Sequence, residues 1–475
     1  MLFLLSTVKM QAPEAKRLRQ IAMLRYLVNH CARRKAMSLN ASEEKVSRLA
    51  RKTFLSMWSY ENPFYEQGKE LCDLLVIFAN DVVIISDKLN QFGTHADFGV
   101  NWKRWYRKAV SASARQLWGA RNHLRSFPDH IFVDAKVSSP LPLKLPPIEL
   151  MRIHLVAVAN GCDDACEDFS GRRGLTIDTK CNGDEDAFTV GCLGTGDDFV
   201  HIISTPALDA LFDSFDTARD FIDYLDRKRS AMLDEDWVIQ GEENLIGAYM
   251  MSQPGNRPFF VPSSTFPQIN GARIVRAGIW DEYLTSEQRQ ARNKFWAKSY
   301  LIDQLIEGVA EDYVNERMLI GQDQPISYHE RAFRLLAGES RLSRQGIAGA
   351  FYDIYREDDT TTFWGAVSES TDDPTICYVW LLYPEPPKEH TLEKIEHQLG
   401  VELSKYMLVA QGKFRHAKRI FGMCLPNRDC SLTTRIFRLI DGAHWTNEMA
   451  EVADLLEATE GIFSKIDQVK IASIR

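Results

Sequence analysis

The chain has 475 residues, of which 45% are hydrophobic and 26% charged, and its formal net charge is −8 at pH 7. This length and composition allow two or three hydrophobic cores and give no sign of disorder. No apolar run approaches the ~18 to 20 residues of a membrane span, and the apolar start Met1 to Leu5 lacks the flanks of a signal peptide. We therefore expect a cytoplasmic α/β protein without a membrane partner.

The first predicted element is a helix over residues 42–58. A capping pattern at Ser42 is followed by apolar residues at roughly helical spacing, namely Val46, Leu49, Phe54 and Trp58. The next segment, 61–66, is poorly patterned, and we expect it to contain a first strand.

A β-hairpin follows, and it is the most informative stretch of the chain. The apolar runs Leu74 to Phe78 and Val82 to Ile85 flank Asn80-Asp81. This pair accepts the positive φ angles of a two-residue turn. The pattern therefore predicts a turn that Ala79 and Val82 close.

Acidic side chains gather at the open end of this hairpin. With that turn, Asp73 faces Lys88 on one side of the ladder, and Asp87 points to the other side. Such a pair can be a plain exposed ion pair, typically worth less than ~1 kcal/mol. However, Glu66 and Glu70 add two carboxylates to an otherwise apolar stretch, and buried strands rarely carry charge without a use. Carboxylate oxygens suit Mg²⁺ or Mn²⁺, which can activate a water molecule.

This hairpin resembles the PD-(D/E)xK nucleases, the restriction-endonuclease-like superfamily. In that pattern an Asp precedes the first strand, a tight turn follows, and the second strand ends in acid-x-Lys. Asp73 and Lys88 match this pattern, whereas the residue two before Lys88 is Ser86 and the nearest carboxylate is Asp87. Either a bulge turns Asp87 inward, or a water-bridged Ser86 and a carboxylate from elsewhere, Glu66 or Glu70, replace the missing ligand. The resemblance implies a catalytic site of Asp73, Lys88, Asp87, Glu70 and Glu66. It implies that the metal ligands are Asp73, Asp87 and Glu70.

The elements after the hairpin extend this resemblance. A helix is predicted over about 102–126 from the spacing of Tyr106, Val110, Ala114, Leu117 and Leu124. His130 to Asp134 then reads as a strand. The order is close to the αβββαβ core of the superfamily, and the resemblance covers about Ser42 to Lys136.

Basic charge is local to two segments beside the hairpin. Residues 1–52 contain twelve bases and three acids, residues 101–126 contain seven bases and no acid, and residues 53–100 contain seven acids and two bases. Bases that flank acids suit a nucleic-acid enzyme, although a charged helix face is often only a solvated face. The predicted nucleic-acid-binding residues are Lys103, Arg104, Arg107, Lys108 and Arg115. We expect DNA ahead of RNA.

Tryptophans in the same helix have two interpretations. Trp102, Trp105 and Trp118 could stack on unpaired bases. Their helical spacing favours core packing instead.

A proline-rich segment gives the clearest predicted boundary. Residues 138–149 read as an extended linker. We therefore predict a nuclease-like domain at 1–137 with basic N-terminal helices, an α/β domain at 150–270 and a helix-rich α/β domain at 271–475. Further expected elements are strands at 152–158, 199–203, 363–367 and 376–382, a helix capped by Asp216, and helices at 285–318, 391–399 and 449–463.

The nine cysteines fit reduced thiols. Cys162, Cys166, Cys181 and Cys192 cluster around a loop, and zinc could bind there, although their spacing matches no standard knuckle. No GxSxG, P-loop or GxGxxG element is present, which argues against a hydrolase triad, an NTPase or a dinucleotide enzyme.

The resemblance leads to a magnesium-dependent endonuclease as the first functional hypothesis. The alternative is a catalytically inactive, nuclease-like protein that binds or senses nucleic acid. A third interpretation is structural, with the basic segments contacting an acidic protein. Analogy with other nuclease-bearing proteins suggests restriction or antiviral defence, and the acidic C-terminal part could mediate assembly with a protein partner or a second copy.

Overall fold

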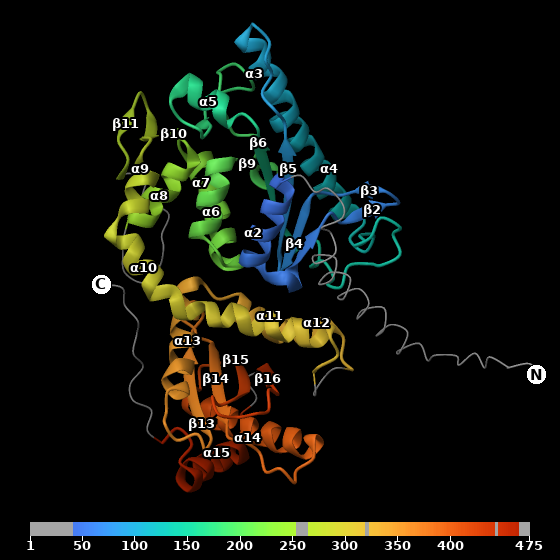
Figure 1. Ribbon diagram of the computed structural model, residues 1–475, viewed down its shortest axis with the longest axis vertical. Helices are drawn as coiled ribbons and strands as arrows, with labels where there is room; N and C mark the ends of the chain where they lie inside the picture. The colour runs from blue at the N-terminus through green and yellow to red at the C-terminus, as the bar shows by residue number, and fades with distance from the viewer. Residues whose placement is uncertain (1–40, 253–264, 319–322, 442–444, 465–475) are drawn as a thin grey trace, which may run out of the picture.

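The computed structural model describes residues 41–252, 265–318, 323–441 and 445–464. The structure is mixed α/β, with 48% helix and 20% strand (Figure 1). The predicted N-terminal helices before residue 41 lie outside the described residues. No helix among the described residues is long and apolar enough to cross a membrane.

The main sheet has five strands in the order β1-β4-β5-β6-β9. Their bounds are β1 Ser59–Glu61, β4 Leu74–Phe78, β5 Asp81–Leu89, β6 Arg152–Asn160 and β9 Val200–Ser204. Strand β4 is antiparallel to β1 and β5, whereas β5, β6 and β9 are mutually parallel. Apolar residues dominate both faces of the central strands because helices cover both faces.

The hairpin is present, but its register differs from the prediction by two residues. Phe78 pairs with Asp81, so the turn is Ala79-Asn80 and not Asn80-Asp81. Ala79 adopts a left-handed φ of 53°, which is uncommon for alanine. Asp81 is buried inside β5, where its carboxylate accepts hydrogen bonds from Arg152 and His154 of the neighbouring strand. These tertiary contacts explain why Asp81 lies in the strand.

Helices on opposite faces enclose this sheet. The predicted first helix is confirmed as α2, Ala41–Trp58, and the second is divided into α3 Phe98–Tyr106, a wide π-turn at Arg107–Ser111 and α4 Ala112–Ser126. Arg51 of α2 contacts Glu61, which shares a face with Leu74 and Ile85. Ser86 points the other way and contacts Gln116 of α4. Because neighbouring strand residues alternate between faces, α2 and α4 lie on opposite sides of the sheet.

The prediction of a strand at His130 to Asp134 was wrong. Only isolated bridges join Phe132 to Phe64 and Pro140. The strand that follows α4 in the sheet is β6, which pairs with β5 over nine positions from Asp81 to Leu89. The proline-rich segment 138–149 lies between α4 and β6, and the sheet that contains β5 and β6 is continuous across the predicted boundary.

Smaller elements complete the N-terminal lobe, which we define as the described residues between 41 and 296. A two-stranded ribbon is formed by β2 Phe64–Glu66 and β3 Lys69–Glu70, and a second sheet has the order β11-β12-β10-β7-β8. Its strands are β7 Thr176–Asp178, β8 Thr189–Val190, β10 Trp237–Gln240, β11 Gln268–Ile269 and β12 Ala272–Val275. The helices are α5 Asp163–Ser170, α6 Thr205–Ser214, α7 Ala218–Asp234, α8 Glu242–Met251, α9 Ile279–Thr285 and α10 Glu287–Trp296. Thr217, and not Asp216, caps α7.

The C-terminal lobe, residues 323–464, is built on a separate sheet in the order β13-β14-β15-β16. Its strands are β13 Trp364–Glu369, β14 Ile376–Tyr383, β15 Arg419–Pro426 and β16 Ile436–Asp441. Its helices are α12 Ile326–Ala337, α13 Arg341–Tyr355, α14 Leu392–Lys413 and α15 Asn447–Glu460. Helix α11, Tyr300–Val314, crosses between the two lobes (Figure 1). The predicted strands at 363–367 and 376–382 are confirmed, and the helix predicted at 391–399 extends to Lys413.

Candidate functional site

One edge of the main sheet collects acidic side chains from three adjacent strands. Strands β1, β5, β6 and β9 all end at this edge, and antiparallel β4 begins there, so we call it the carboxyl edge. Glu61 is the last residue of β1, Asp73 precedes β4, and Asp87 lies near the end of β5. All three line a recess of about 10 Å³, together with Val46, Ser47, Asn62 and Leu74. That volume is close to the space needed by one water molecule.

Asp87 is the buried centre of this edge, with an exposed fraction of 3%. Its Oδ1 accepts a hydrogen bond of 2.5 Å from the side-chain amide of Asn160, at the end of β6. The oxygen of that amide accepts from Thr205 at 2.7 Å, and the same hydroxyl lies 2.9 Å from Asp163. Burial raises the pKa of Asp163. A polar chain therefore links the ends of β5, β6 and β9.

Gly161 makes room for this chain. It follows Asn160 with a left-handed φ of 92°, and a Cβ at this position would lie 2.4 Å from the carbonyl oxygen of Asn90. Only glycine combines that backbone angle with so close an approach.

Asp73 is held at the same edge by the backbone of β5. Its Oδ2 accepts a 2.6 Å hydrogen bond from the amide of Asp87. Because Leu74 pairs with Ile85, Asp73 is level with Ser86, and Lys88 lies two residues farther along β5. The prediction that Asp73 faces Lys88 was therefore wrong by two positions. Asp87 does point to the side opposite Ser86, as strand alternation predicts.

Glu61 belongs to the recess, although sequence reasoning did not select it. Its carboxylate accepts hydrogen bonds from Ser47 and Arg51 of α2. These two residues are four apart and therefore share one helix face. Their spacing is the signal that could have pointed to an acidic partner on the adjacent strand.

The structure places the other predicted catalytic residues elsewhere. Glu66 and Glu70 lie on the β2-β3 ribbon, where exposed Glu66 forms a 2.8 Å ion pair with Lys69. Neither residue lines the recess, and neither does Lys88. The acidic residues that share the recess are Glu61, Asp73 and Asp87.

The donor chemistry of this recess suits a hard cation, because carboxylate oxygens are what Mg²⁺ prefers. As they stand, however, these carboxylates accept hydrogen bonds from the Asp87 amide, from Asn160 and from α2. Among the described ranges, no group of three or more Asp, Glu, His or Cys side chains is arranged to hold a metal ion.

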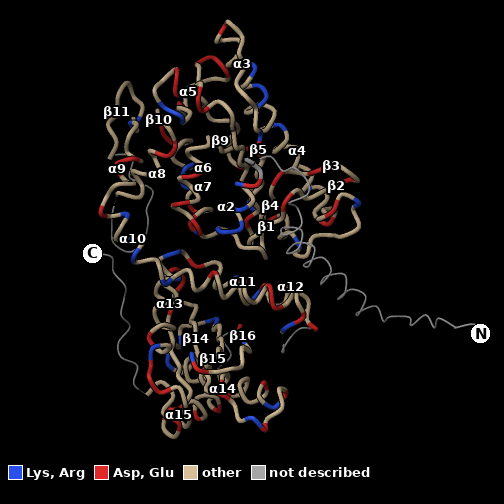
Figure 2. Tube along the Cα trace, in the orientation of Figure 1, with Lys and Arg blue, Asp and Glu red and all other residues tan. Residues whose placement is uncertain are grey.

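A row of basic side chains runs along α3, the π-turn and α4, and we call it the basic face. All five of its side chains are exposed, and none forms an ion pair with another residue in the described part of the chain: Lys103, Arg104, Arg107, Lys108 and Arg115. Figure 2 shows basic residues following these helices along the outer side of the N-terminal lobe. Farther along α4, Arg121 and Arg125 instead pair with Asp198 and Asp197.

Trp105 connects the basic face to the carboxyl edge. It is buried, as core packing predicts, and so is Trp102. The indole N–H of Trp105 donates to the carbonyl oxygens of Asn90 at 2.8 Å and Asn160 at 3.4 Å. These carbonyls belong to the ends of β5 and β6, so the buried face of α3 at Trp105 packs against the carboxyl edge.

The four predicted zinc cysteines do not share one site. Cys162 and Cys166 are buried around α5, where the thiol of Cys166 contacts the carbonyl of Gly174. Cys192 instead contacts the carbonyl of Met232. Burial raises the pKa of all four thiols.

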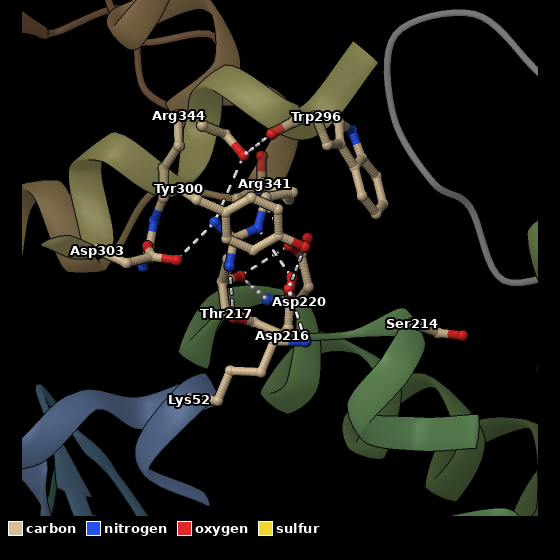
Figure 3. Close-up of polar contacts among 12 residues, drawn as sticks. Lys52, Ser214, Asp216, Thr217, Asp220, Trp296, Tyr300, Asp303, Arg341 and Arg344 are labelled. Carbon is tan, nitrogen blue, oxygen red and sulfur yellow. Dashed lines mark hydrogen bonds and ion pairs between the residues drawn. The ribbon is translucent and has the colours of Figure 1, made fainter. Parts of the chain in front are cut away.

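A second polar cluster lies where α7, α11 and α13 meet, and we call it the junction cluster (Figure 3). Arg341 donates to Asp216 at 2.8 Å and to Asp303 at 2.8 Å, and Asp303 also accepts from Arg344. Both arginines are 1% exposed. Tyr300 donates to Asp216 at 2.8 Å and lies under the Arg341 guanidinium. Burial opposes ionisation, but Arg341 and Lys52 hold the pKa of Asp216 below its ordinary value.

Helix α2 contacts both the carboxyl edge, through Arg51, and the junction cluster, through Lys52. The helix is broken at Leu55, where φ is 62°. The amide and hydroxyl of Ser56 donate to Glu307 of α11 at 2.6 and 2.7 Å, and Trp58 donates to Glu330 of α12 at 2.8 Å. The start of α2 therefore covers the carboxyl edge, and its end is bound to α11 and to α12 of the C-terminal lobe.

Comparison of the chain with protein families, with curated proteins and with solved structures gives no match.

Proposed function

We propose that the N-terminal lobe binds nucleic acid, DNA in the first place, through the basic face. The observation that carries this proposal is the set of five exposed basic side chains without ion pairs among the described residues. Lysine and arginine gain affinity for a phosphate backbone by displacing condensed counterions. An ordinary solvated helix face usually mixes both signs of charge, whereas residues 101–126 contain no acid.

The element order supports a nuclease-like framework for this binding. The main elements α2, β1, β4, β5, α4 and β6 occur in the order αβββαβ, which the resemblance to the restriction-endonuclease-like superfamily implies. We infer that this lobe is related to that core, with β9 as an added strand. Binding beside the carboxyl ends of parallel strands is also the general tendency of open α/β sheets.

Endonuclease activity with Mg²⁺ or Mn²⁺ is the second candidate. It is favoured by the recess that Glu61, Asp73 and Asp87 share. The corrected register argues against it, because Ser86 is level with Asp73, where the acid-x-Lys pattern requires a carboxylate. We therefore place binding without cleavage first. A role in restriction or antiviral defence stays a prediction that depends on analogy.

The binding proposal is tested with a duplex DNA and a series of salt concentrations. The variant Arg104→Ala/Arg107→Ala/Lys108→Ala should bind more weakly, and the slope of log K against log salt should fall by about 0.9 for each phosphate that the variant no longer neutralises. The control is Arg276→Ala/Lys394→Ala/Arg428→Ala, which removes three basic side chains from other parts of the chain. Equal affinity of the two triple variants would overturn the proposal.

Cleavage is tested separately with wild type, Asp73→Asn and Lys88→Ala in Mg²⁺, Mn²⁺ or EDTA. Binding without cleavage by any form supports the first candidate. Cleavage that needs a metal and both side chains would move the endonuclease to first place. Cleavage that persists in both variants would show that Asp73 and Lys88 are not its catalytic residues.

A further inference from the structure

The C-terminal lobe has a cleft of about 650 Å³ beside β16. Six consecutive residues line it, from Arg435 through Ile440. Because strand side chains alternate between two faces, a cleft against one face would touch only every second residue. The cleft therefore runs along the edge of the strand.

This edge is open for pairing. Strand β16 is the last strand of its sheet and pairs only with β15 among the residues described by the structure. In an antiparallel edge strand, alternate N–H and C=O groups point away from the neighbouring strand. Those groups face the cleft, where an added strand would satisfy them.

The two walls of the cleft come from opposite faces of the sheet. Phe437 and Leu439 pack into the core on the α12 side, and Ile436 and Ile440 pack on the α14 side. The walls are completed by Asp323 and Gln324, which precede α12, by Tyr328 and His329 from α12, and by Ser404 and Met407 from α14. The cleft is thus a slot between two helices, with the strand edge at its base.

The charged residues that line the slot are the arginines Arg435 and Arg438 and the acid Asp323. Arg438 donates to the hydroxyl of Ser404 and forms no ion pair within the described residues. Arg435, on the other face, is 3.3 Å from Asp312. A carboxylate next to Arg438 would gain a charge-assisted hydrogen bond, which is stronger than a neutral one.

We propose that this slot binds an extended acidic peptide of a protein partner, which adds to β16 as a fifth strand. Main-chain hydrogen bonds supply affinity in this mode, and pockets for alternate side chains supply specificity. At ~3.3 Å per residue, β16 accommodates about six partner residues. An acidic side chain of the peptide pairs with Arg438.

Two other occupants fit less well. The chain's own residues 465–475 contain Lys465, Lys470 and Arg475 against Asp467, so their charge has the same sign as Arg438. A second copy would bring its own β16 edge, which lies between its own helices and carries another Arg438. Both alternatives place like charges together.

The test uses the full chain and two labelled peptides of alternating valine and charged residues, one with glutamate and one with lysine. By fluorescence anisotropy, wild type should bind the glutamate peptide at least about tenfold more tightly. Arg438→Glu should reverse this preference. Arg356→Glu, an exposed position at the end of α13, should leave it unchanged. Hydrogen exchange should slow in residues 435–441 when the glutamate peptide is bound.

Several results would overturn the proposal. Absence of binding to either peptide, or a preference unchanged by Arg438→Glu, would exclude the acidic strand. Binding seen only after removal of residues 465–475 would identify the chain's own tail as the occupant. A concentration-dependent dimer that Arg438→Glu abolishes would identify a second copy.

Discussion

The junction cluster and the carboxyl edge are both rich in charge, but they distribute it differently. In the junction cluster, both arginines are 1% exposed, and they contact the buried carboxylate of Asp216 and the 14% exposed carboxylate of Asp303. At the carboxyl edge, buried Asp87 is held by the neutral amide of Asn160, and the cations of the basic face remain exposed. Charge that is balanced inside the fold holds elements together. Charge that is presented to solvent is available to a ligand.

The largest expected effect comes from breaking the balance of the junction cluster. Arg341→Met removes the cation between Asp216 and Asp303 and leaves buried carboxylates without it. We expect a loss of about 3–5 kcal/mol in the free energy of unfolding, measured by urea denaturation. Arg276→Met is the control, because its ion pair with Glu282 is exposed, and it should cost less than about 1 kcal/mol. Equal losses would remove the distinction between the two kinds of pair.

Glu339 is a buried acid next to the junction cluster. Its carboxylate contacts hydroxyl groups, whereas the carboxylates of the cluster contact arginines. Its carboxylate accepts from Ser370 and Tyr378, and its carbonyl accepts from Arg344. Burial, followed by the charge of Asp372, raises its pKa from 4.5 to about 7. A raised carboxyl pKa means that the folded state holds the proton more tightly. The contribution of this group to stability is therefore full below pH ~4.5 and is lost as the pH rises to about 7.

Glu339→Gln should abolish that dependence. Relative to wild type, the variant should gain on the order of 1–3 kcal/mol in unfolding free energy between pH 5 and pH 8. Urea midpoints at the two pH values measure this difference. Glu243, whose pKa burial also raises to about 7, remains in both proteins and serves as an internal reference. If the unfolding free energies of variant and wild type differ by the same amount at pH 5 and pH 8, Glu339 does not cause the pH dependence.

Asn160→Ala tests whether the carboxyl edge depends on its neutral amide. The substitution removes the donor to Asp87 and the acceptor for Thr205. We expect a loss of about 1–3 kcal/mol in unfolding free energy, smaller than at Arg341 because no cation is removed. DNA binding by the basic face should persist. Asn122→Ala, at an exposed position of α4, is the control and should change stability by less than about 0.5 kcal/mol. A loss no greater than this control would show that the amide does not support the edge.

The smallest effect is expected at the β2-β3 ribbon. Lys69 and Glu66 form an exposed ion pair outside both polar regions. Lys69→Ala should leave the melting temperature and the affinity for DNA unchanged within error. A clear loss of affinity would bring the ribbon back into the functional site.

Local patterns predicted much of this fold. Periodicity and capping over short stretches of sequence predict helix α2, the helical stretch around α4 and the strands β13 and β14. The hairpin was found for the same reason. Its register was missed because Asp81 is fixed by His154 and Arg152, more than seventy positions later.

The site residues that could not be predicted from the sequence are held by contacts between distant parts of the chain. Glu61 is identified as a site residue only from the fold, in which Ser47 and Arg51 of α2 donate hydrogen bonds to it. Asn160 lies beyond the proline-rich segment that we interpreted as a boundary. In the junction cluster, Asp216 contacts Arg341, which is 125 positions later in the chain. A local sequence pattern cannot predict such a contact.

The broken helix α2 has a consequence for how the protein unfolds. One half of α2 contacts Glu61 at the carboxyl edge, and the other half is bound by Glu307 and Glu330. A continuous hydrophobic core also includes residues of both lobes, from Val46 to Leu425. Neither lobe can lose its structure without exposing apolar surface of the other. We therefore expect a single cooperative transition in calorimetry, with equal calorimetric and van't Hoff enthalpies.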